Sequence, residues 1–368
     1  MPLITQTVKG NEYCYYFNII RFKNTSIPIS TFIGRKDLDP EEFRQKRFLA
    51  LPKHFEKMKS LVLGERIRKY HFENLPTQDN VESVELFSAQ YIVLRSELTK
   101  EEEKEFERVL FTKYVYGTTA IEGNNYTEEE TERLLVDGLV SKNRTKDETK
   151  AINNYHKVRK FVRNYNSTLI SEQFIKNIHV LLMKGLEIKR GRSIEAGKYR
   201  EDNAELKDVA FNSCLPEVIE DRMKYVVLDY YDGMNRGVHP VELASIFHQK
   251  FEEIHPFSDG NGRTGREILS FMLKVGGFPE IYIPPAEREL YLAALKAGNN
   301  SNYVPLIDFL IHRMFRTFVY FMSKTQQLLK GTMSTEFKEY VESSEGGKDV
   351  YSEFYELIAD YSKSGRLP

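Results

Sequence analysis

The sequence predicts a mostly α-helical protein with a β-hairpin at its N-terminus. After Asp39, apolar residues recur at helical spacing through most of the chain. Before it, aromatic and branched residues lie on both sides of the polar stretch Lys23-Asn24-Thr25, which indicates two strands and a turn within residues 1–36. These two patterns favour a helical bundle with a small β-sheet addition.

Length and charge narrow the class of protein further. The chain has 368 residues, enough for one large or two ordinary domains. Its 53 Lys and Arg residues balance 54 Asp and Glu residues, so no overall attraction to nucleic acid or to an anionic membrane is expected. Cys14 and Cys214 lie far apart in no metal-binding spacing, and a signal peptide and long apolar runs are lacking. The chain is therefore expected in the reducing cytoplasm.

Residues 37–98 are predicted to form a helical N-terminal region. Asp39-Pro40 offers an N-cap and a first-turn proline for a helix that is broken or kinked at Pro52 and resumes to about Tyr70. Another helix is expected around Leu86–Leu94.

A longer helix is predicted from Thr99, which forms a capping-box pattern with Glu102. It ends in a stretch that contains Thr118, Glu122 and Gly123. Taken alone, Glu122 is an ordinary solvated glutamate, and the glycine after it ends the helix.

Several shorter helices should follow this stretch. Thr127 and Glu130 repeat the capping pattern for a helix that stops at Gly138, and further helices are expected over about 146–164 and 171–186. His179 lies on the last of these, where a structural role is expected.

The most informative stretch runs from His255 to Arg266, between two apolar helical segments. Its glycines let the backbone approach a ligand. The second helix begins with unpaired N–H groups beside two arginines, which together favour an anion. The stretch therefore predicts a phosphate site.

Each polar residue of this stretch has a chemical use. His255, with an unperturbed pKa near ~6.5, can take a proton from a hydroxyl. Asp259 is a hard oxygen ligand suited to Mg²⁺. Asn261 can donate to a phosphate, while Arg263 and Arg266 present planar guanidinium groups to different phosphoryl groups. Singly, these residues indicate little, but their joint pattern H-x-F-x-D-G-N-G-R-x-x-R favours a nucleotide.

That pattern resembles the signature of the Fic family, whose members mostly transfer AMP from ATP to protein hydroxyls. The resemblance implies a Fic-type helical bundle over residues 99–325, with the catalytic loop at residues 255–266. It also implies roles for single residues: His255 as the base, Asp259 as the Mg²⁺ ligand, Arg266 as the γ-phosphate contact, and Gly260, Asn261, Gly262 and Arg263 as further phosphate contacts.

Two further resemblances bear on the reaction. Related Doc kinases carry Lys where this chain has Gly262, so the glycine favours nucleotidyl transfer over phosphorylation. Thr118-x-x-x-Glu122-Gly123 resembles the inhibitory motif [ST]-x-x-x-E-[GN] of many Fic proteins. The implication is that Glu122 pairs with Arg266 and occupies the guanidinium that would otherwise bind the γ-phosphate.

Outside the two motifs the resemblance is less specific. Gly197–Phe211 would form the β-hairpin flap that holds a substrate segment. Tyr291, with Asn299 or Asn300, would contact the adenosine, and a core role for Tyr291 is equally open. Residues 326–368 are expected to form a helical tail.

The function expected is transfer of AMP from Mg-ATP to a Ser, Thr or Tyr hydroxyl of a protein, including the chain itself, with Glu122 holding the reaction off. One alternative is hydrolytic removal of AMP, with Glu122 positioning the water. Another is a nucleotide-binding regulator without turnover, against which the intact His255 argues. A homodimer is a possible assembly, whereas neither a membrane nor nucleic acid is an expected partner.

Overall fold

The computed structural model describes residues 3–22, 25–74, 100–186, 195–203 and 214–317, together with single positions between 84 and 98. The described residues fall into two compact units. One comprises the chain up to Glu65 with Ala89–Phe106, and the other comprises Arg66–Ser88 with Glu107–Thr317. The predicted tail, residues 326–368, lies outside the described residues.

The first unit contains a three-stranded antiparallel sheet of β1 (Leu3–Val8), β2 (Asn11–Phe22) and β3 (Thr25–Arg35), in that order. The predicted hairpin is the pair β2 and β3, in which Tyr15 faces Phe32. The added edge strand β1 is almost entirely exposed, so the alternation of buried and exposed residues that marks a strand is absent from its sequence. The predicted turn at Lys23-Asn24 lies outside the described residues.

Helix α1 (Pro40–Lys69) covers one face of this sheet. Asp39 Oδ2 accepts the Glu41 N–H at 3.3 Å, as expected for an N-cap. Of the break or kink predicted at Pro52, the break was wrong, because α1 continues through this residue. One missing N–H costs a single helical bond, whereas the helix is held along its length by packing on the sheet. The buried contacts are made by Ala50, Met58 and Val62 with Cys14, Tyr16, Ile29 and Ile33.

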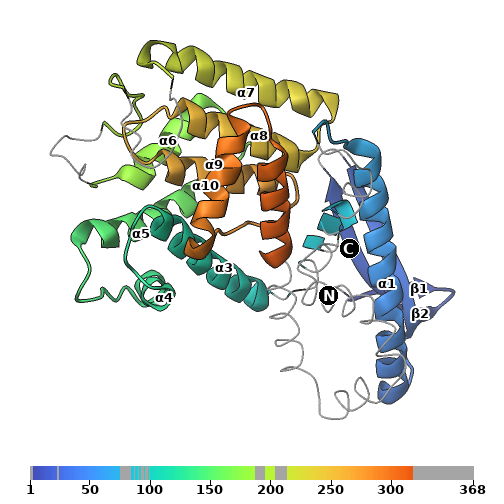
Figure 1. Cartoon of the computed structure of the whole chain (residues 1–368). Helices are drawn as coiled ribbons and strands as arrows, with labels where there is room; N and C mark the ends of the chain where they lie inside the picture. Colours follow the sequence, from blue (N-terminus) through green and yellow to red (C-terminus); the bar gives the residue numbers. More distant parts are fainter. Residues whose placement is uncertain are drawn as a thin grey trace. The chain divides into compact units, whose positions relative to one another are not determined.

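The second unit is helical and is built around one central helix pair (Figure 1). The pair is α8 (Pro240–Ile254) and α9 (Asn261–Val275), which pack against each other. Around it lie α3 (Lys100–Ile121), α4 (Glu128–Asp137), α5 (Lys146–Arg163), α6 (Glu172–Met183), the short η1 (Pro216–Val218) and η2 (Pro285–Glu287), α7 (Ile219–Arg236) and α10 (Arg288–Gly298). Residues 304–317 are helical as well.

Helix α9 is central because almost all of its residues are buried against neighbouring parts of the protein. Ile268, Leu269 and Met272 are buried, and α6 and α8 pack against the helix. In turn, α8 contacts α7 and α10. The loop between α8 and α9 thus joins two helices that are themselves packed against each other and against α6, α7 and α10. Among the helices described, none has both the length and the apolar character required to cross a bilayer.

Some predicted helix ends are confirmed. At the start of α4, Thr127 Oγ1 accepts the Glu130 N–H at 3.2 Å, and the Glu130 carboxylate accepts the Thr127 N–H at 2.9 Å. The same helix stops at Gly138, which is left-handed with φ 70°. Thr99 lies outside the described residues, as do residues 204–211 of the predicted flap, and residues 195–203 contain no strand.

Candidate active site

His255 stands immediately after the last residue of α8. It is the C-cap of that helix in a left-handed backbone conformation, φ 50° and ψ 60°, and its N–H donates to Phe251 O. Burial lowers the pKa of the imidazole to about 4. The side chain is therefore neutral at physiological pH, the state that a general base requires.

The loop after His255 is closed by an amide side chain. Asn261 Oδ1 accepts the Phe257 N–H at 2.8 Å, and Asn261 Nδ2 donates to Phe257 O at 2.7 Å. Phe257 is fully buried, so its side chain anchors the loop in the interior. The Asn261 side chain therefore holds the loop backbone, and its phosphate contact stays a prediction.

His179 supports the same loop from α6. Its ring stacks on Phe257, with the ring centroids 3.8 Å apart. Its Nε2 donates to Asp259 O at 2.9 Å, and its Nδ1 accepts the Gly197 N–H at 2.8 Å. Burial lowers the pKa of this histidine to about 4, which keeps the ring neutral with one donor and one acceptor nitrogen. The structural role predicted for His179 is confirmed by these bonds.

The start of α9 is open to an anion. Its N-cap is Gly260, left-handed with φ 80°, and no side chain caps the helix, so the first N–H groups remain available. A Cβ at Gly260 would lie 2.4 Å from Met183 Sδ, which excludes a larger residue. Asp259 Oδ1 accepts the Gly260 N–H at 2.5 Å and a bond from Arg263 Nη2 at 3.2 Å. The predicted phosphate and metal residues thus meet at one helix end.

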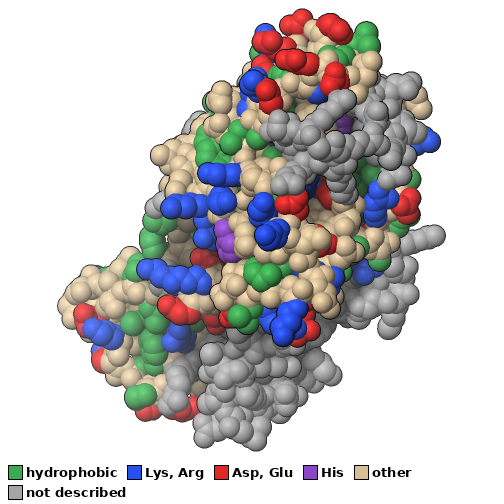
Figure 2. All heavy atoms as spheres, turned by 90° about the vertical axis from the view of Figure 1, so that its left-hand side faces the viewer, with side chains coloured by type: hydrophobic (Ala, Val, Ile, Leu, Met, Phe, Trp, Pro, Cys, Tyr) green, Lys and Arg blue, Asp and Glu red, His purple; other side chains and the backbone are tan. Residues whose placement is uncertain are grey.

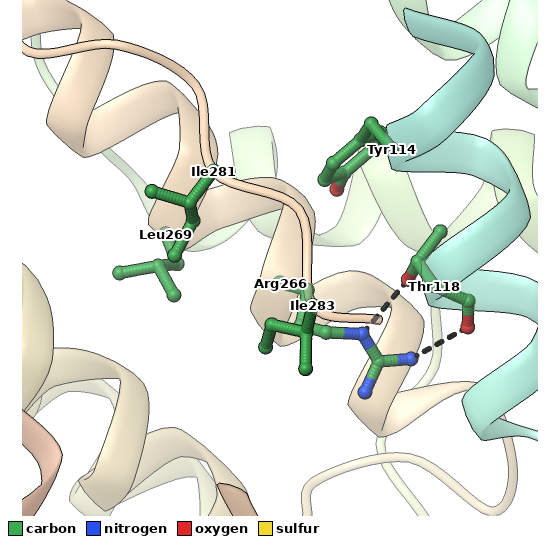
Figure 3. Close-up of a pocket in the computed structure, with 6 residues that line it drawn as sticks. All are labelled: Tyr114, Thr118, Arg266, Leu269, Ile281 and Ile283. Atoms are coloured by element: carbon green, nitrogen blue, oxygen red, sulfur yellow. Dashed lines mark hydrogen bonds between the residues drawn. The ribbon is translucent and has the colours of Figure 1, made fainter. Parts of the chain in front are cut away.

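Glu122 reaches this helix end from α3. Arg266 Nη2 donates to Glu122 Oε1 at 2.7 Å, although 144 residues separate the two. The guanidinium also donates through Nε to Thr118 Oγ1 at 2.8 Å and through Nη2 to Thr118 O at 3.0 Å (Figure 3). Figure 3 shows Arg266 pointing from its helix toward Thr118, beside a small pocket that Tyr114 also lines. Thr118 and Glu122, the side chains of the predicted inhibitory motif, therefore both contact Arg266.

The electrostatics of this pair are those of a strong ion pair. Partial burial raises the pKa of Glu122, but the positive charges of Arg266 and Arg263 outweigh this effect. The pKa of the carboxyl group is therefore below its usual value. The Arg266 side chain is only 5% exposed, and that of Glu122 is 37% exposed. The arginine is thus buried, whereas the glutamate side chain is partly open to solvent.

Gly262 makes room for the Glu122 carboxylate. A Cβ at this position would lie 2.4 Å from Glu122 Oε1 and 3.0 Å from Arg266 Nη1. The carboxylate therefore lies against the backbone of the first turn of α9.

A left-handed glycine and two hydrogen bonds fix the chain around Glu122. Gly123 is left-handed with φ 88° and ends α3. Arg288 Nε donates to Ile121 O at 3.2 Å, and Asn124 Nδ2 donates to Glu148 O at 3.0 Å. The end of α3 is thus tied on both sides of the glutamate.

The sequence also predicted an adenosine contact for Tyr291. This residue is 1% exposed, and its hydroxyl is 2.7 Å from His248 Nε2 in the interior. The core role, which the sequence left open, is therefore the one observed. Asn299 accepts from Gln249 Nε2 at 3.0 Å, and Asn300 is exposed.

Glu252, one turn before His255, was missed in the sequence. It is 6% exposed, and burial raises its pKa to about 8. Nothing in its spacing marks it, because a glutamate near a helix end is usually solvated.

On the face drawn in Figure 2, a His side chain is visible among several Lys and Arg side chains, so positive charge gathers there.

Comparison with known proteins agrees with this geometry. A model of the Fic/DOC family matches residues 169–273, the range from α6 to α9 that contains the loop. The chain contains a Fic domain. The matched range contains the loop between α8 and α9, ends before α10 and does not include Glu122.

Relatives of the Fic domain carry an activity in their names. Protein adenylyltransferase fic-1 of Caenorhabditis elegans is 29% identical over 198 residues, which cover 53% of this chain and 38% of that protein. Protein adenylyltransferase Fic of Culex quinquefasciatus is 26% identical over 235 residues, or 61% of this chain and 44% of that protein. The chain therefore spans less than half the length of these two relatives.

Solved structures show the same fold. A Fic domain containing signaling protein from Bacteroides thetaiotaomicron superposes with a TM-score of 0.59 at 22% identity, covering 67% of this chain and 97% of that one. Fic-1 from C. elegans superposes with a TM-score of 0.58 at 22% identity, covering 79% of each chain. The mostly helical Fic fold predicted from the sequence is confirmed.

Proposed function

We propose that this protein is an autoinhibited protein adenylyltransferase. It transfers AMP from ATP to a Ser, Thr or Tyr hydroxyl of a protein, including its own chain, and Glu122 holds the reaction off. The observation that carries this proposal is the bond of Glu122 to Arg266 at the first turn of α9, beside His255 and the open helix end. The Fic domain and the adenylyltransferase names of its relatives support it.

The residues of the loop supply the chemistry of transfer. Neutral His255 takes the proton of the target hydroxyl, and the hydroxyl oxygen attacks the α-phosphorus of ATP. A new P–O bond forms, the bond to the β-phosphate oxygen breaks, and pyrophosphate leaves. The N–H groups at the start of α9 and the charge of Arg263 stabilise negative charge that develops on the phosphoryl oxygens.

The donor set fits a magnesium ion bound together with a nucleotide. The Asp259 side chain is 37% exposed, and its recorded bonds fall on one oxygen, Oδ1. The part of the chain that the structure describes has no group of three or more acidic, His or Cys ligands for a metal. Mg²⁺ is usually held by one or two carboxylates, phosphate oxygens and water, so Asp259 alone would serve. When bound, the ion would neutralise phosphate charge.

Asp259→Asn should weaken the dependence on magnesium without disturbing the loop. The amide oxygen can still accept from Gly260 and Arg263, whereas the charge that attracts the ion is lost. In a Glu122→Gly parent, the Mg²⁺ concentration for half-maximal labelling should rise by about tenfold or more, since affinity follows the charge of the ligands. If the parent labels equally well in excess chelator, the metal role is rejected.

The transfer rate should begin to fall only at an unusually low pH. Burial lowers the pKa of His255 to about 4, so the neutral base persists as pH falls. In Glu122→Gly, kcat/KM should remain nearly constant from about pH 8 to about pH 5, instead of falling near the unperturbed value of ~6.5. Circular dichroism at each pH checks that the fold is intact. A half-maximal rate near ~6.5 would contradict the assignment of a buried neutral base.

The proposed reaction is tested by the position of the label in ATP. Glu122→Gly is incubated with ATP labelled either at the α- or at the γ-phosphate, alone and with a protein extract. Adenylyl transfer leaves label on protein only from α-labelled ATP. Label from γ-labelled ATP would show phosphorylation instead, and label from neither would reject transfer.

The place of action proposed for the chain is the cytoplasm. Neither Cys14 nor Cys214 forms a disulfide, which is compatible with a reducing compartment.

A further inference from the structure

A buried arginine holds the backbone around the catalytic histidine. Arg200 is 6% exposed, and its guanidinium donates to four carbonyl oxygens. Nε bonds His255 O at 2.8 Å, and Nη2 bonds Ile254 O at 3.3 Å. Nη2 also bonds Cys214 O at 2.6 Å, and Nη1 bonds Asp202 O at 2.8 Å. One side chain thus joins the end of α8 to two segments that are distant in sequence.

The chemistry of these contacts is unusual for a buried arginine. All four acceptors are uncharged carbonyl oxygens, and burial lowers the pKa of the guanidinium. A buried charge is costly unless hydrogen bonds compensate it. Here the carbonyl end of α8 supplies part of that compensation, because the C-terminus of a helix carries partial negative charge. Arg200 is therefore used to hold backbone and not to pair with a carboxylate.

The backbone that Arg200 holds is strained. His255 is left-handed, with φ 50° and ψ 60°, a conformation that side chains other than glycine adopt rarely. Such a conformation persists only where its surroundings impose it. Three consecutive carbonyls, those of Ile254, His255 and Pro256, accept from Arg200, the last from its backbone N–H at 2.9 Å.

The segment that carries Arg200 meets the loop at a second point. Gly197 N–H donates to His179 Nδ1, and His179 Nε2 donates to Asp259 O. Residues 195–203 therefore touch the loop on both sides of Phe257, once at His255 and once, through His179, at Asp259.

We propose that Arg200 is a positioning residue for the catalytic base. By fixing the carbonyls on both sides of the His255 Cα atom, it holds the left-handed turn that aims the imidazole at the target hydroxyl. The inference rests on the proposed function, because it takes His255 as the base. It goes beyond that function by naming the residue that orients the base without touching substrate.

The test compares Arg200→Ala and Arg200→Lys in the Glu122→Gly parent. Arg200→Ala should lower kcat by about 10²-fold, as misplacement of a reacting group by about 1 Å does, while the Kd of ATP stays near that of the parent. The kcat of Arg200→Lys should lie between those of the parent and of Arg200→Ala, because one ammonium group cannot bond all four carbonyl oxygens. Added guanidinium ion should restore part of the activity of Arg200→Ala and none in the parent.

A matched control separates orientation from stability. Arg159 is another arginine of the same unit with a side chain only 13% exposed, and it pairs with the Glu280 carboxylate instead of with backbone carbonyls around His255. Arg159→Ala should lower the Tm and leave kcat of the folded protein near the parent value. Equal losses of kcat in the Arg159 and Arg200 variants would overturn the proposal, as would a fall in ATP affinity that accounts for the whole loss.

A second readout does not depend on transfer. The imidazole NMR signals of His255, assigned with His255→Gln, should shift in Arg200→Lys and remain unchanged in Arg159→Ala. Unchanged signals in Arg200→Lys would reject the positioning role even if the parent had no adenylyl transfer. Shifted signals in an inactive parent would uphold the positioning and reject only the proposed function. Because Arg200→Lys retains the charge, it serves if Arg200→Ala does not fold.

Discussion

Glu122→Gly should raise adenylyl transfer by roughly tenfold to a hundredfold. The substitution removes a charge-assisted hydrogen bond to Arg266, and such bonds are worth about 1.5–3 kcal/mol. It also clears the space beside Gly262 that the carboxylate occupies. Incorporation of label from α-labelled ATP, measured as an initial rate, gives the change. Glu122→Asp, one methylene shorter, should relieve inhibition only in part.

A matched control for this variant is Glu128→Gly. Glu128 is the first residue of α4, and its carboxylate forms an ion pair at 2.5 Å with Lys113 of α3. Its replacement should leave the rate nearly unchanged, since a partly exposed pair contributes little. If Glu122→Gly is no faster than the wild type, autoinhibition is rejected. If it loses activity on a target that already carries AMP, the alternative of hydrolytic AMP removal takes its place.

His255→Ala should lower transfer by about 10²–10⁴-fold in the Glu122→Gly parent, the usual effect of removing a general base. ATP binding should be nearly unchanged, because the expected phosphate contacts lie at the start of α9 and not on the imidazole. Calorimetric titration with ATP checks binding, and label incorporation checks transfer. The matched control is His156→Ala, an exposed histidine on α5. If His255→Ala transfers AMP at the parent rate, the assignment of His255 as the base is rejected.

The local features of this fold were predictable because they depend on residues close in sequence. The capping box of Thr127 and Glu130 needs two side chains three residues apart, and the stop at Gly138 needs only the backbone freedom of glycine. The position of His255 at the end of α8 also follows from a helical pattern followed by a glycine-rich loop. The pairing of Glu122 with Arg266 was expected from a resemblance alone, since no local pattern relates residues so far apart.

Features that depend on tertiary packing were not predictable. Pro52 remains within α1, where packing on the sheet supports the helix against a local break. Asn261 bonds the Phe257 backbone, and Tyr291 lies in the interior beside His248, although both have side chains suited to a ligand. Arg200 stands in a basic, extended stretch of sequence, and nothing local shows that its partners are carbonyls.

The central claim is that Glu122 restrains transfer through Arg266, and a double-mutant cycle measures this most directly. Initial rates of AMP incorporation are compared for the wild type, Glu122→Gly, Arg266→Ala and the double variant. Partners in one network are non-additive, so Glu122→Gly should accelerate transfer only when Arg266 is present. We expect the double variant to be no faster than Arg266→Ala. An equal acceleration with and without the arginine would contradict the account.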